Sequence, residues 1–310
     1  MLQIPQKDFA RSVTKSNVGT CALADWLEAN LLFSDKNISK SDVSDLLIEE
    51  EICDDAGQDL AHLIATDGWS EISLRKRWGG TSPVLEIASN RLSFAPDWRD
   101  DISRAFFLVL SLQKSYPNWA EEHRDNSTQG ELFEKIVEEI CPGLLPGWDV
   151  LRAGWSPENT VSISGIVPIL CEHLHTSGHP SLDEWTSDAA NDGGLDIVCF
   201  RRFPDEREAT PTYFLQCASG ANWRDKIHTP SAITWMKYLD AAVQPSTGIA
   251  APFVISQKDM KRSGLSGQIT VFDRIRLLHA VYNEGVEISE KLATDLIAWL
   301  EPRIDALPRT

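Results

Sequence analysis

The chain contains the stretch Asn191-Asp-Gly-Gly-Leu-Asp-Ile-Val-Cys-Phe200, and this stretch says most about the fold. Its two glycines allow a tight backbone turn, and the apolar run Leu195–Phe200 after them predicts a short buried strand. Asp196 lies inside that run. A carboxylate among apolar neighbours is costly unless it is paired or binds a metal. The stretch therefore predicts a strand that carries a functional carboxylate.

A second apolar strand is predicted at Thr212–Cys217, after the turn-forming Pro204-Asp-Glu, and it places Gln216 among apolar neighbours. Upstream, an amphipathic helix is predicted over 128–140, with Glu134 at the edge of its inner face. If the two strands are adjacent, Glu134, Asp196 and Gln216 converge on one point. Oxygen ligands of this kind suit Mg²⁺ and phosphodiester hydrolysis.

Four motifs occur in a fixed order: Gly130-Glu-Leu-Phe-Glu134, Gly147-Trp-Asp-Val150, Asp192-Gly-Gly-Leu-Asp-Ile-Val198 and Phe214-Leu-Gln-Cys-Ala218. Together they resemble the PD-(D/E)XK, or restriction-endonuclease-like, superfamily over about residues 125–260. The pattern is similar to the Mrr-type and bacterial defence-associated nucleases. The resemblance implies an α/β fold with a mixed sheet flanked by helices, a Mg²⁺ or Mn²⁺ cofactor, and hydrolysis of DNA.

The resemblance also implies roles for single residues. Glu134 matches the helix acid, Asp196 the metal-binding aspartate, and Gln216 a variant of the (D/E) position. The family's lysine is absent, because Ala218 stands in its place. Two alternatives stay open: Lys226 supplies the amine that positions the attacking water, or the site is inactive. Asp192 either assists as an outer-sphere acid or only shapes the glycine turn.

Basic side chains follow the site. Residues 219–280 carry eight Lys and Arg against four Asp and Glu, whereas residues 121–218 carry six against eighteen. Arg224 and Trp223 lie just after the second strand, and Trp223 either stacks on a base or anchors the segment to the sheet. Lys258, Lys261 and Arg262, in an expected loop, suit sequence-neutral contacts with phosphates.

The length of 310 residues favours two domains. We expect a mostly helical module with a small hairpin at 1–120 and the nuclease-like domain at 121–310. Helices followed by a hairpin also describe a winged helix, but the region has no basic recognition helix, so a scaffold or partner-docking role is preferred. Other expected elements are short helices at 59–65 and 72–78, helices at 18–32, 102–112, 167–175, 223–239, 273–281 and 288–299, and strands at 148–155 and 249–256.

Several classes of protein are disfavoured. No apolar run reaches membrane-spanning length, and the N-terminus lacks a secretory signal, so a cytoplasmic location is expected. The six cysteines form no CxxC pair, and Cys171, His175 and His179 lack an evident fourth zinc ligand. Cys217, inside an apolar strand, is expected to be a core residue and not a nucleophile. P-loop, GxSxG and HExxH motifs are absent.

The sequence therefore favours a metal-dependent DNA endonuclease of a bacterial anti-phage defence system. The alternative is a degenerate nuclease-fold subunit that binds DNA or a partner protein in a defence complex. The net charge of −17 agrees with this alternative. A third class, an unrelated metal-free interaction protein, explains the charge but not the ordered motifs. A protein partner from the same operon and a homo-oligomer are both left open.

Overall fold

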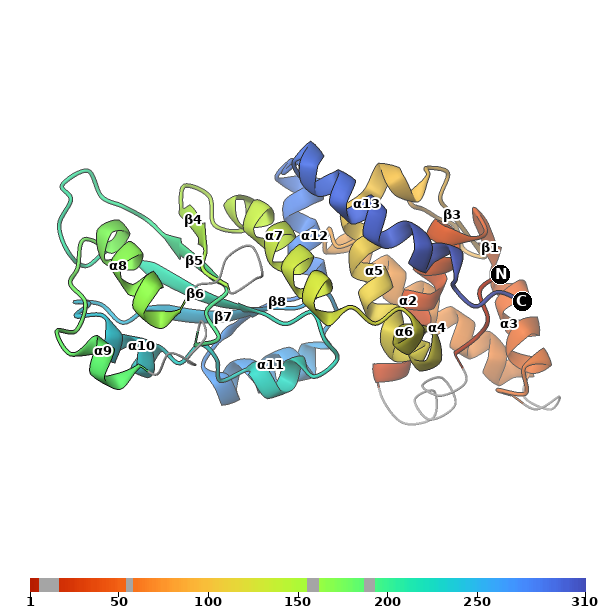
Figure 1. Ribbon diagram of the computed structural model, residues 1–310. Helices are drawn as coiled ribbons and strands as arrows, with labels where there is room; N and C mark the ends of the chain where they lie inside the picture. The colour runs from red at the N-terminus through yellow and green to blue at the C-terminus, as the bar shows by residue number, and fades with distance from the viewer. Residues whose placement is uncertain (6–16, 54–57, 155–161, 187–192) are drawn as a thin grey trace.

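The computed structural model describes residues 1–5, 17–53, 58–154, 162–186 and 193–310. A five-stranded sheet with its covering helices lies at one end of an elongated molecule, and a helical part with a small sheet lies at the other (Figure 1). The two termini meet at the helical end, where Leu2 and Arg309 form an antiparallel bridge. None of the helices in these ranges has both the length and the apolar character needed to cross a membrane.

The helical part confirms the expected hairpin and corrects one expectation about helices. Its elements are α2 (Asn17–Phe33), β1 (Asn37–Ser39), α3 (Lys40–Glu49), α4 (Gln58–Arg77), β2 (Glu86–Ile87), β3 (Arg91–Ser93), a 3₁₀ turn (Trp98–Asp101), α5 (Ile102–Ser115) and α6 (Pro117–Glu122). The hairpin β2–β3 gains β1 as a third antiparallel strand.

The two short helices expected at 59–65 and 72–78 are one helix, α4. Gly68 lies inside this helix, and a Cβ there would lie 2.9 Å from side-chain atoms of Leu23 and Leu27. The glycine thus permits α2 to approach closely.

The large sheet is mixed, as expected. Its strands are β4 (Asp149–Arg152), β5 (Ile197–Phe200), β6 (Thr212–Cys217), β7 (Ser246–Ala250) and β8 (Thr270–Phe272), hydrogen-bonded in that order. The pairs β4–β5 and β5–β6 are antiparallel, and β6–β7 and β7–β8 are parallel. From this register, β4 ends where β5 begins, and β6 and β7 end at the same edge. Residues that precede β5 or follow β4 and β6 are therefore brought together.

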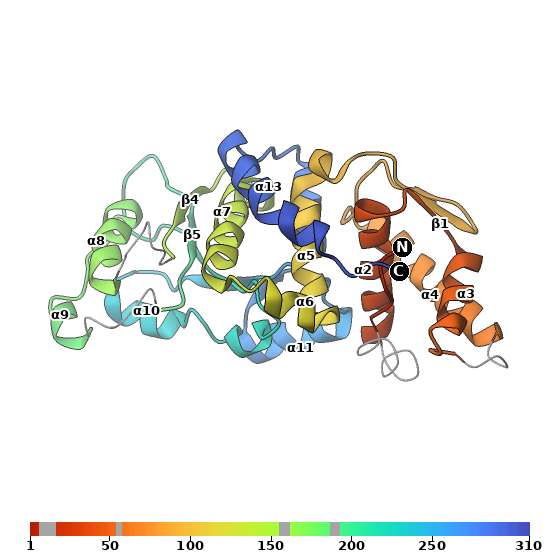
Figure 2. The same ribbon diagram turned by 45° about the vertical axis from the view of Figure 1, so that its right-hand side comes forward.

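Helices cover both faces of this sheet. The remaining elements are α7 (Asn126–Leu144), α8 (Ile163–Leu174), α9 (Leu182–Trp185), a 3₁₀ turn (Trp223–Lys226), α10 (Ala232–Tyr238), α11 (Gln257–Gly267), α12 (Arg274–Asn283) and α13 (Glu290–Asp305). α7 and α8 lie on opposite sides of β4 and β5 (Figure 2). Alternate residues of β5 divide accordingly: Ile197 and Cys199 join the core under α7, and Val198 and Phe200 join the core under α8 and α10. The expected α/β class is confirmed.

Several expected boundaries are wrong for reasons of packing. The helix predicted over 128–140 is α7, and it continues through Pro142 and Gly143 to Leu144. Near a helix end, proline removes only one backbone hydrogen bond. Gly143 has no side chain, so α12 can pack closely against it; a Cβ at 143 would lie 3.0 Å from the Cβ of Ala280. The helix predicted over 167–175 is α8, which begins earlier, at Ile163 after the capping Ser162, so Pro168 lies inside it.

The second half contains further corrections. The helix expected at 223–239 is two pieces, a 3₁₀ turn and α10, separated by Pro230. The strand expected at 249–256 is shifted to β7, which ends before Pro252. The expected loop at Lys258–Arg262 is helix α11, which Ser256 caps by accepting from the Asp259 N–H, and β8 was not expected at all.

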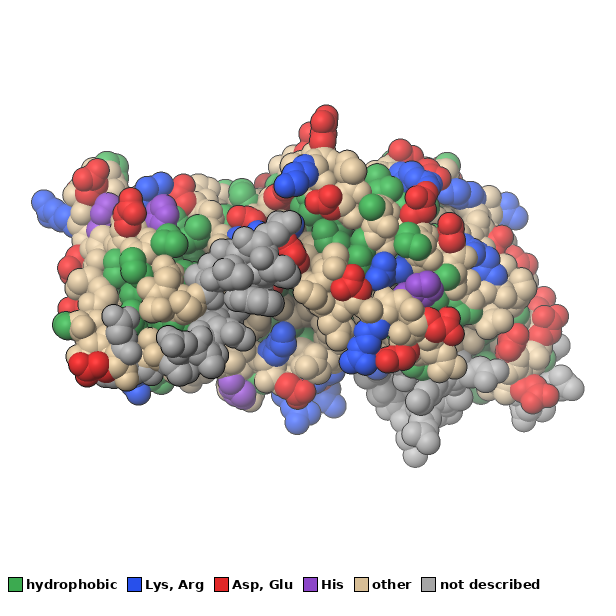
Figure 3. All heavy atoms as spheres, in the orientation of Figure 1, with side chains coloured by type: hydrophobic (Ala, Val, Ile, Leu, Met, Phe, Trp, Pro, Cys, Tyr) green, Lys and Arg blue, Asp and Glu red, His purple; other side chains and the backbone are tan. Residues whose placement is uncertain are grey.

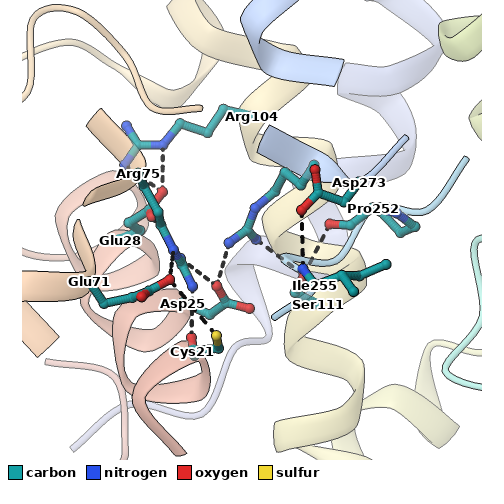
Figure 4. A network of polar contacts seen from close by, with 11 residues as sticks. Cys21, Asp25, Glu28, Glu71, Arg75, Arg104, Ser111, Pro252, Ile255 and Asp273 are labelled. Atoms are coloured by element: carbon teal, nitrogen blue, oxygen red, sulfur yellow. Dashed lines mark hydrogen bonds and ion pairs between the residues drawn. The ribbon is translucent and has the colours of Figure 1, made fainter. Parts of the chain in front are cut away.

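A buried ionic network joins the two parts of the molecule (Figure 4). Arg75 of α4 donates to Asp25 (2.7 Å) and to Glu28 (2.8 Å) of α2. Arg104 of α5 donates to the other Glu28 oxygen at 3.2 Å, and Arg274 of α12 donates to Asp25. All three arginines are buried. One apolar core also continues from α2 and α5 into α7, α13 and the sheet, and the proposed domain boundary at 120 stays a prediction.

Candidate active site

Asp196 is held at the sheet edge by both neighbouring strands. It directly precedes β5, and its N–H donates to the Leu215 carbonyl at 3.0 Å. Its own carbonyl accepts from the N–H groups of Ala153 (2.7 Å) and Gly154 (2.9 Å). Its side chain is 4% exposed, and Oδ2 accepts from the Cys217 N–H and from Nε2 of Gln216. The turn and both strands therefore fix this carboxylate at one point.

Glu134 reaches the same point from α7. Its carboxylate lies against the end of β4, because a Cβ on Gly154 would be 2.3 Å from Oε2 of Glu134. The Gly154 N–H in turn donates to the Asp196 backbone. The missing side chain at position 154 thus makes room for the Glu134 carboxylate beside Asp196. Sequence reasoning did not identify Gly154, because its importance depends on which helix packs over it.

Gln216 completes the group predicted from the sequence. It lies one residue before the end of β6, is 6% exposed, and donates its amide to Asp196. Its Oε1 lies 3.1 Å from Oγ1 of Thr229, a residue that the sequence did not single out. Gly194 closes over both side chains, since its Cβ would lie 2.8 Å from Oε1 of Gln216 and 2.9 Å from Cβ of Thr229. The structure thus brings Glu134, Asp196 and Gln216 together.

Thr229 links the turn that bears Lys226 to Gln216, because its Oγ1 lies 3.1 Å from Oε1 of Gln216 and 2.9 Å from the Lys226 carbonyl oxygen. Burial raises the pKa of the Cys217 thiol well above its ordinary value, the charges of Asp196 and Glu134 raise it further, and the Lys226 ammonium opposes them. All three charges therefore act on one buried atom. A thiol with so high a pKa stays protonated at neutral pH, which agrees with the expectation that Cys217 is not a nucleophile.

The position of the missing lysine is closed. Ala218 is fully buried and packs in a small apolar group with Trp223 and Ile249. Lys226 is half-buried, in the 3₁₀ turn that follows β6. A lysine at 218 would displace this apolar packing, whereas Lys226 lies in the turn beyond it.

The donor set fits a hard divalent cation. It comprises two carboxylates, which Mg²⁺ and Mn²⁺ accept, and the Gln216 amide, whose oxygen they would accept only after the amide turns, since Nε2 faces Asp196. Gly154 and Gly194 let the side chains pack closely, because a Cβ at 154 would lie 2.3 Å from Oε2 of Glu134 and a Cβ at 194 would lie 2.8 Å from Oε1 of Gln216. Within the described ranges, no group of three or more His, Cys, Asp and Glu side chains could hold a metal, so a cation here would depend on the Gln216 amide. The same finding covers Cys171, His175 and His179. Asp192 lies outside the described residues.

The expected DNA-contacting residues lie beside this edge of the sheet. The Arg224 guanidinium stacks 4.6 Å from the Trp223 ring centroid and pairs with Asp259 at 3.2 Å. Trp223 itself is buried, which places it as an anchor of the turn to the sheet. On α11, Lys258, Lys261, Arg262 and the 73% exposed Leu265 line an open surface. In Figure 3, Lys and Arg side chains project from the lower edge, where α11 lies in Figure 1.

Comparisons with known proteins add little to this geometry. The chain matches no protein-family model and no curated protein sequence. Among solved structures it is similar to the restriction endonuclease FokI, at 11% sequence identity and a TM-score of 0.27. The match covers 91% of this chain and 48% of the FokI chain, so this chain spans about half the length of that protein. A likeness at this level settles neither fold nor function.

Proposed function

We propose that the chain is a metal-dependent endonuclease that hydrolyses DNA phosphodiester bonds, and that it serves bacterial anti-phage defence. One observation supports the proposal of catalysis: at one edge of a mixed sheet Gln216 donates to Asp196, Glu134 packs against Gly154, and Thr229 links Gln216 to the turn that bears Lys226. Isolated acids are common on surfaces, but a buried carboxylate with a second carboxylate and an amide packed close to it is characteristic of sites that bind a ligand. The order of the motifs in the sequence agrees with this chemistry.

Each residue has a role that follows from its position. Glu134, Asp196 and Gln216 would hold the cation, which when bound would supply Lewis-acid polarisation of the scissile phosphate. The Lys226 ammonium offsets negative charge and orients a water through N–H donation. Buried strand backbone fixes Asp196, so little reorganisation is needed when substrate arrives.

The surface of α11 is proposed to guide DNA to this edge. Lys258, Lys261 and Arg262 are exposed and occupy one helical face at spacings of three and four residues. Cations in such a row contact phosphates without reading sequence. The acidic remainder of the molecule would repel DNA elsewhere, which confines binding to this face.

The experiment is cleavage of supercoiled and linear DNA by the purified full-length chain with Mg²⁺, Mn²⁺ or EDTA. We expect cleavage with either metal and none with EDTA. Asp196→Asn should lower the rate at least 100-fold, and Lys226→Ala at least 10-fold. Lys237→Ala, an exposed lysine on α10, is the matched control and should retain the wild-type rate. Metal-dependent cleavage that survives Asp196→Asn would contradict the proposal.

A second candidate is a catalytically silent subunit that binds DNA or a partner protein. The observation that favours it is the closed position of Ala218, where the nuclease pattern requires a lysine. This candidate predicts that wild type and Asp196→Asn bind DNA equally and that neither cleaves it. Cleavage by the wild type alone would exclude it.

A further inference from the structure

Thr229 connects Gln216 to the turn that carries Lys226. Its Oγ1 lies 3.1 Å from Oε1 of Gln216 and 2.9 Å from the carbonyl oxygen of Lys226. The Thr229 N–H also donates to that carbonyl, at 3.0 Å. A hydroxyl has one proton, so it can donate to only one of the two oxygens at a time. The hydroxyl therefore has two alternative hydrogen-bonding states.

These two states correspond to the two faces of the Gln216 amide. In the structure, Nε2 donates to Asp196 and Oε1 points to Thr229, which donates its proton to it. A hard cation binds the oxygen of an amide and not its nitrogen. For Gln216 to act as a ligand beside Asp196, its oxygen must face Asp196 and its nitrogen must face Thr229. The Thr229 hydroxyl can then accept from that nitrogen and give its own proton to the Lys226 carbonyl.

Packing keeps this pair of side chains in contact. Gly194, which has φ +74°, lies directly against the side chains of Gln216 and Thr229. A Cβ at position 194 would not fit beside either of them. Gln216 is buried, so water is a poor substitute partner for its amide. A valine at 229 would keep the shape of threonine but could satisfy neither orientation.

We propose that Thr229 is a positioning residue that allows the Gln216 amide to turn its oxygen toward a divalent cation beside Asp196. The same hydroxyl ties this orientation to the turn bearing Lys226. The proposal rests on the proposed function, because it requires that a cation binds at this edge.

The test is calorimetric titration of the full-length chain with MnCl₂ in the absence of DNA. We expect Thr229→Val to raise the Kd for Mn²⁺ about 10-fold or more, as loss of a group that orients a ligand commonly does. Thr229→Ser keeps the hydroxyl and should stay within about threefold of wild type. The control is Thr294→Val on α13, whose exposed hydroxyl donates to the Glu290 carbonyl at 2.9 Å and whose loss should change nothing. Wild-type affinity in Thr229→Val would overturn the proposal, as would equal losses in Thr229→Val and Thr229→Ser.

An Asp196→Asn arm separates this proposal from the proposed function. If Asp196→Asn abolishes Mn²⁺ binding while Thr229→Val does not weaken it, only the role of Thr229 fails. If the wild type binds no Mn²⁺, both fail. A measurement on the wild type alone covers the case in which Thr229→Val does not fold: Mg²⁺ should shift the Nε2 amide resonances of Gln216 in an NMR spectrum, assigned by their loss in Gln216→Glu. Unshifted resonances at saturating Mg²⁺ would overturn the proposal.

Discussion

Gly154 shows how much of the site depends on a side chain that is absent. Asp196, Gln216 and Glu134 could be selected from the sequence, because polar groups inside apolar strands and on the inner edge of a helix are costly exceptions that demand a reason. Gly154 and Thr229 could not be selected. Their contacts, with Glu134 and with Gln216, join segments whose proximity exists only after the sheet has formed.

Replacing Gly154 by alanine should disable the site without unfolding the chain. The added Cβ would lie 2.3 Å from Oε2 of Glu134, the mobile end of a long side chain, so the carboxylate moves away and the backbone does not. We expect DNA cleavage to fall at least 10-fold, with a thermal midpoint within a few degrees of wild type. The control is Gly130→Ala on α7, where a Cβ meets nothing within 4 Å. Helix propensity makes that change stabilising by up to about 1 kcal/mol. Full activity in Gly154→Ala would show that DNA cleavage does not require the Glu134 carboxylate at its observed position.

Helices and strands with a clear apolar period could be predicted from the sequence. Elements whose limits depend on tertiary contacts or on a helix cap could not. The strands β5 and β6 and helix α5 follow from continuous apolar runs. α11 was assigned to a loop because its exposed basic face and two glycines hide its period, and its start depends on the Ser256 cap. As a helix, α11 presents its cations in one row, which a loop would not do.

Charge reversal on α11 should weaken DNA binding in a salt-dependent way. Lys261→Glu removes one phosphate contact and adds a repulsion, so the Kd measured in EDTA should rise several-fold. The slope of log Kd against log salt concentration should fall by about one. Lys291→Glu, an exposed lysine on α13, changes the net charge identically and serves as the control. Equal effects of the two variants would mean that only net charge matters and that α11 is not the binding surface.

For the whole molecule, the buried network of Figure 4 couples the helical part to the sheet. It contains Arg75, Arg104 and Arg274 with Asp25 and Glu28, from helices α2, α4, α5 and α12. No sequence motif predicts this network, because its residues are far apart in the chain and each resembles an ordinary surface charge. Although the composition is rich in acids, two of them, Asp25 and Glu28, balance buried arginines.

Removing one arginine should be far more damaging than removing an exposed one. Arg75→Met leaves buried Glu28 and the partly buried Asp25 short of a partner, which typically costs 3–5 kcal/mol, so we expect the free energy of unfolding to fall by about that amount. The measurement is urea denaturation followed by circular dichroism. Arg99→Met removes an exposed guanidinium paired with Asp97 and Glu301, and should leave the midpoint nearly unchanged. Similar losses in both variants would contradict a special role for the network.

The network also predicts an acid sensitivity with a definite sign. Burial alone would raise the pKa of Glu28, but Arg104, Arg75 and Arg274 lower it from 4.5 to about 2. Because the folded-state pKa is depressed, this stabilisation is complete above about pH 4.5 and is lost as the pH falls toward 2. Asp101, whose pKa burial raises, acts in the opposite direction. We therefore expect the free energy of unfolding to fall less steeply in Glu28→Gln than in wild type over this range, by up to about 1.4 kcal/mol per pH unit. Identical slopes would show that Glu28 is not held ionised.

The central claim is that a divalent cation binds where Glu134, Asp196 and Gln216 meet, and anomalous diffraction from Mn²⁺-soaked crystals of the full-length chain tests it most directly. The account predicts one anomalous peak bonded to a carboxylate oxygen of Glu134 and of Asp196, with the amide oxygen of Gln216 turned toward it. Asp196→Asn crystals soaked identically should lack the peak. No peak at this edge of the wild-type sheet at saturating Mn²⁺, or an equal peak in Asp196→Asn, would contradict the account.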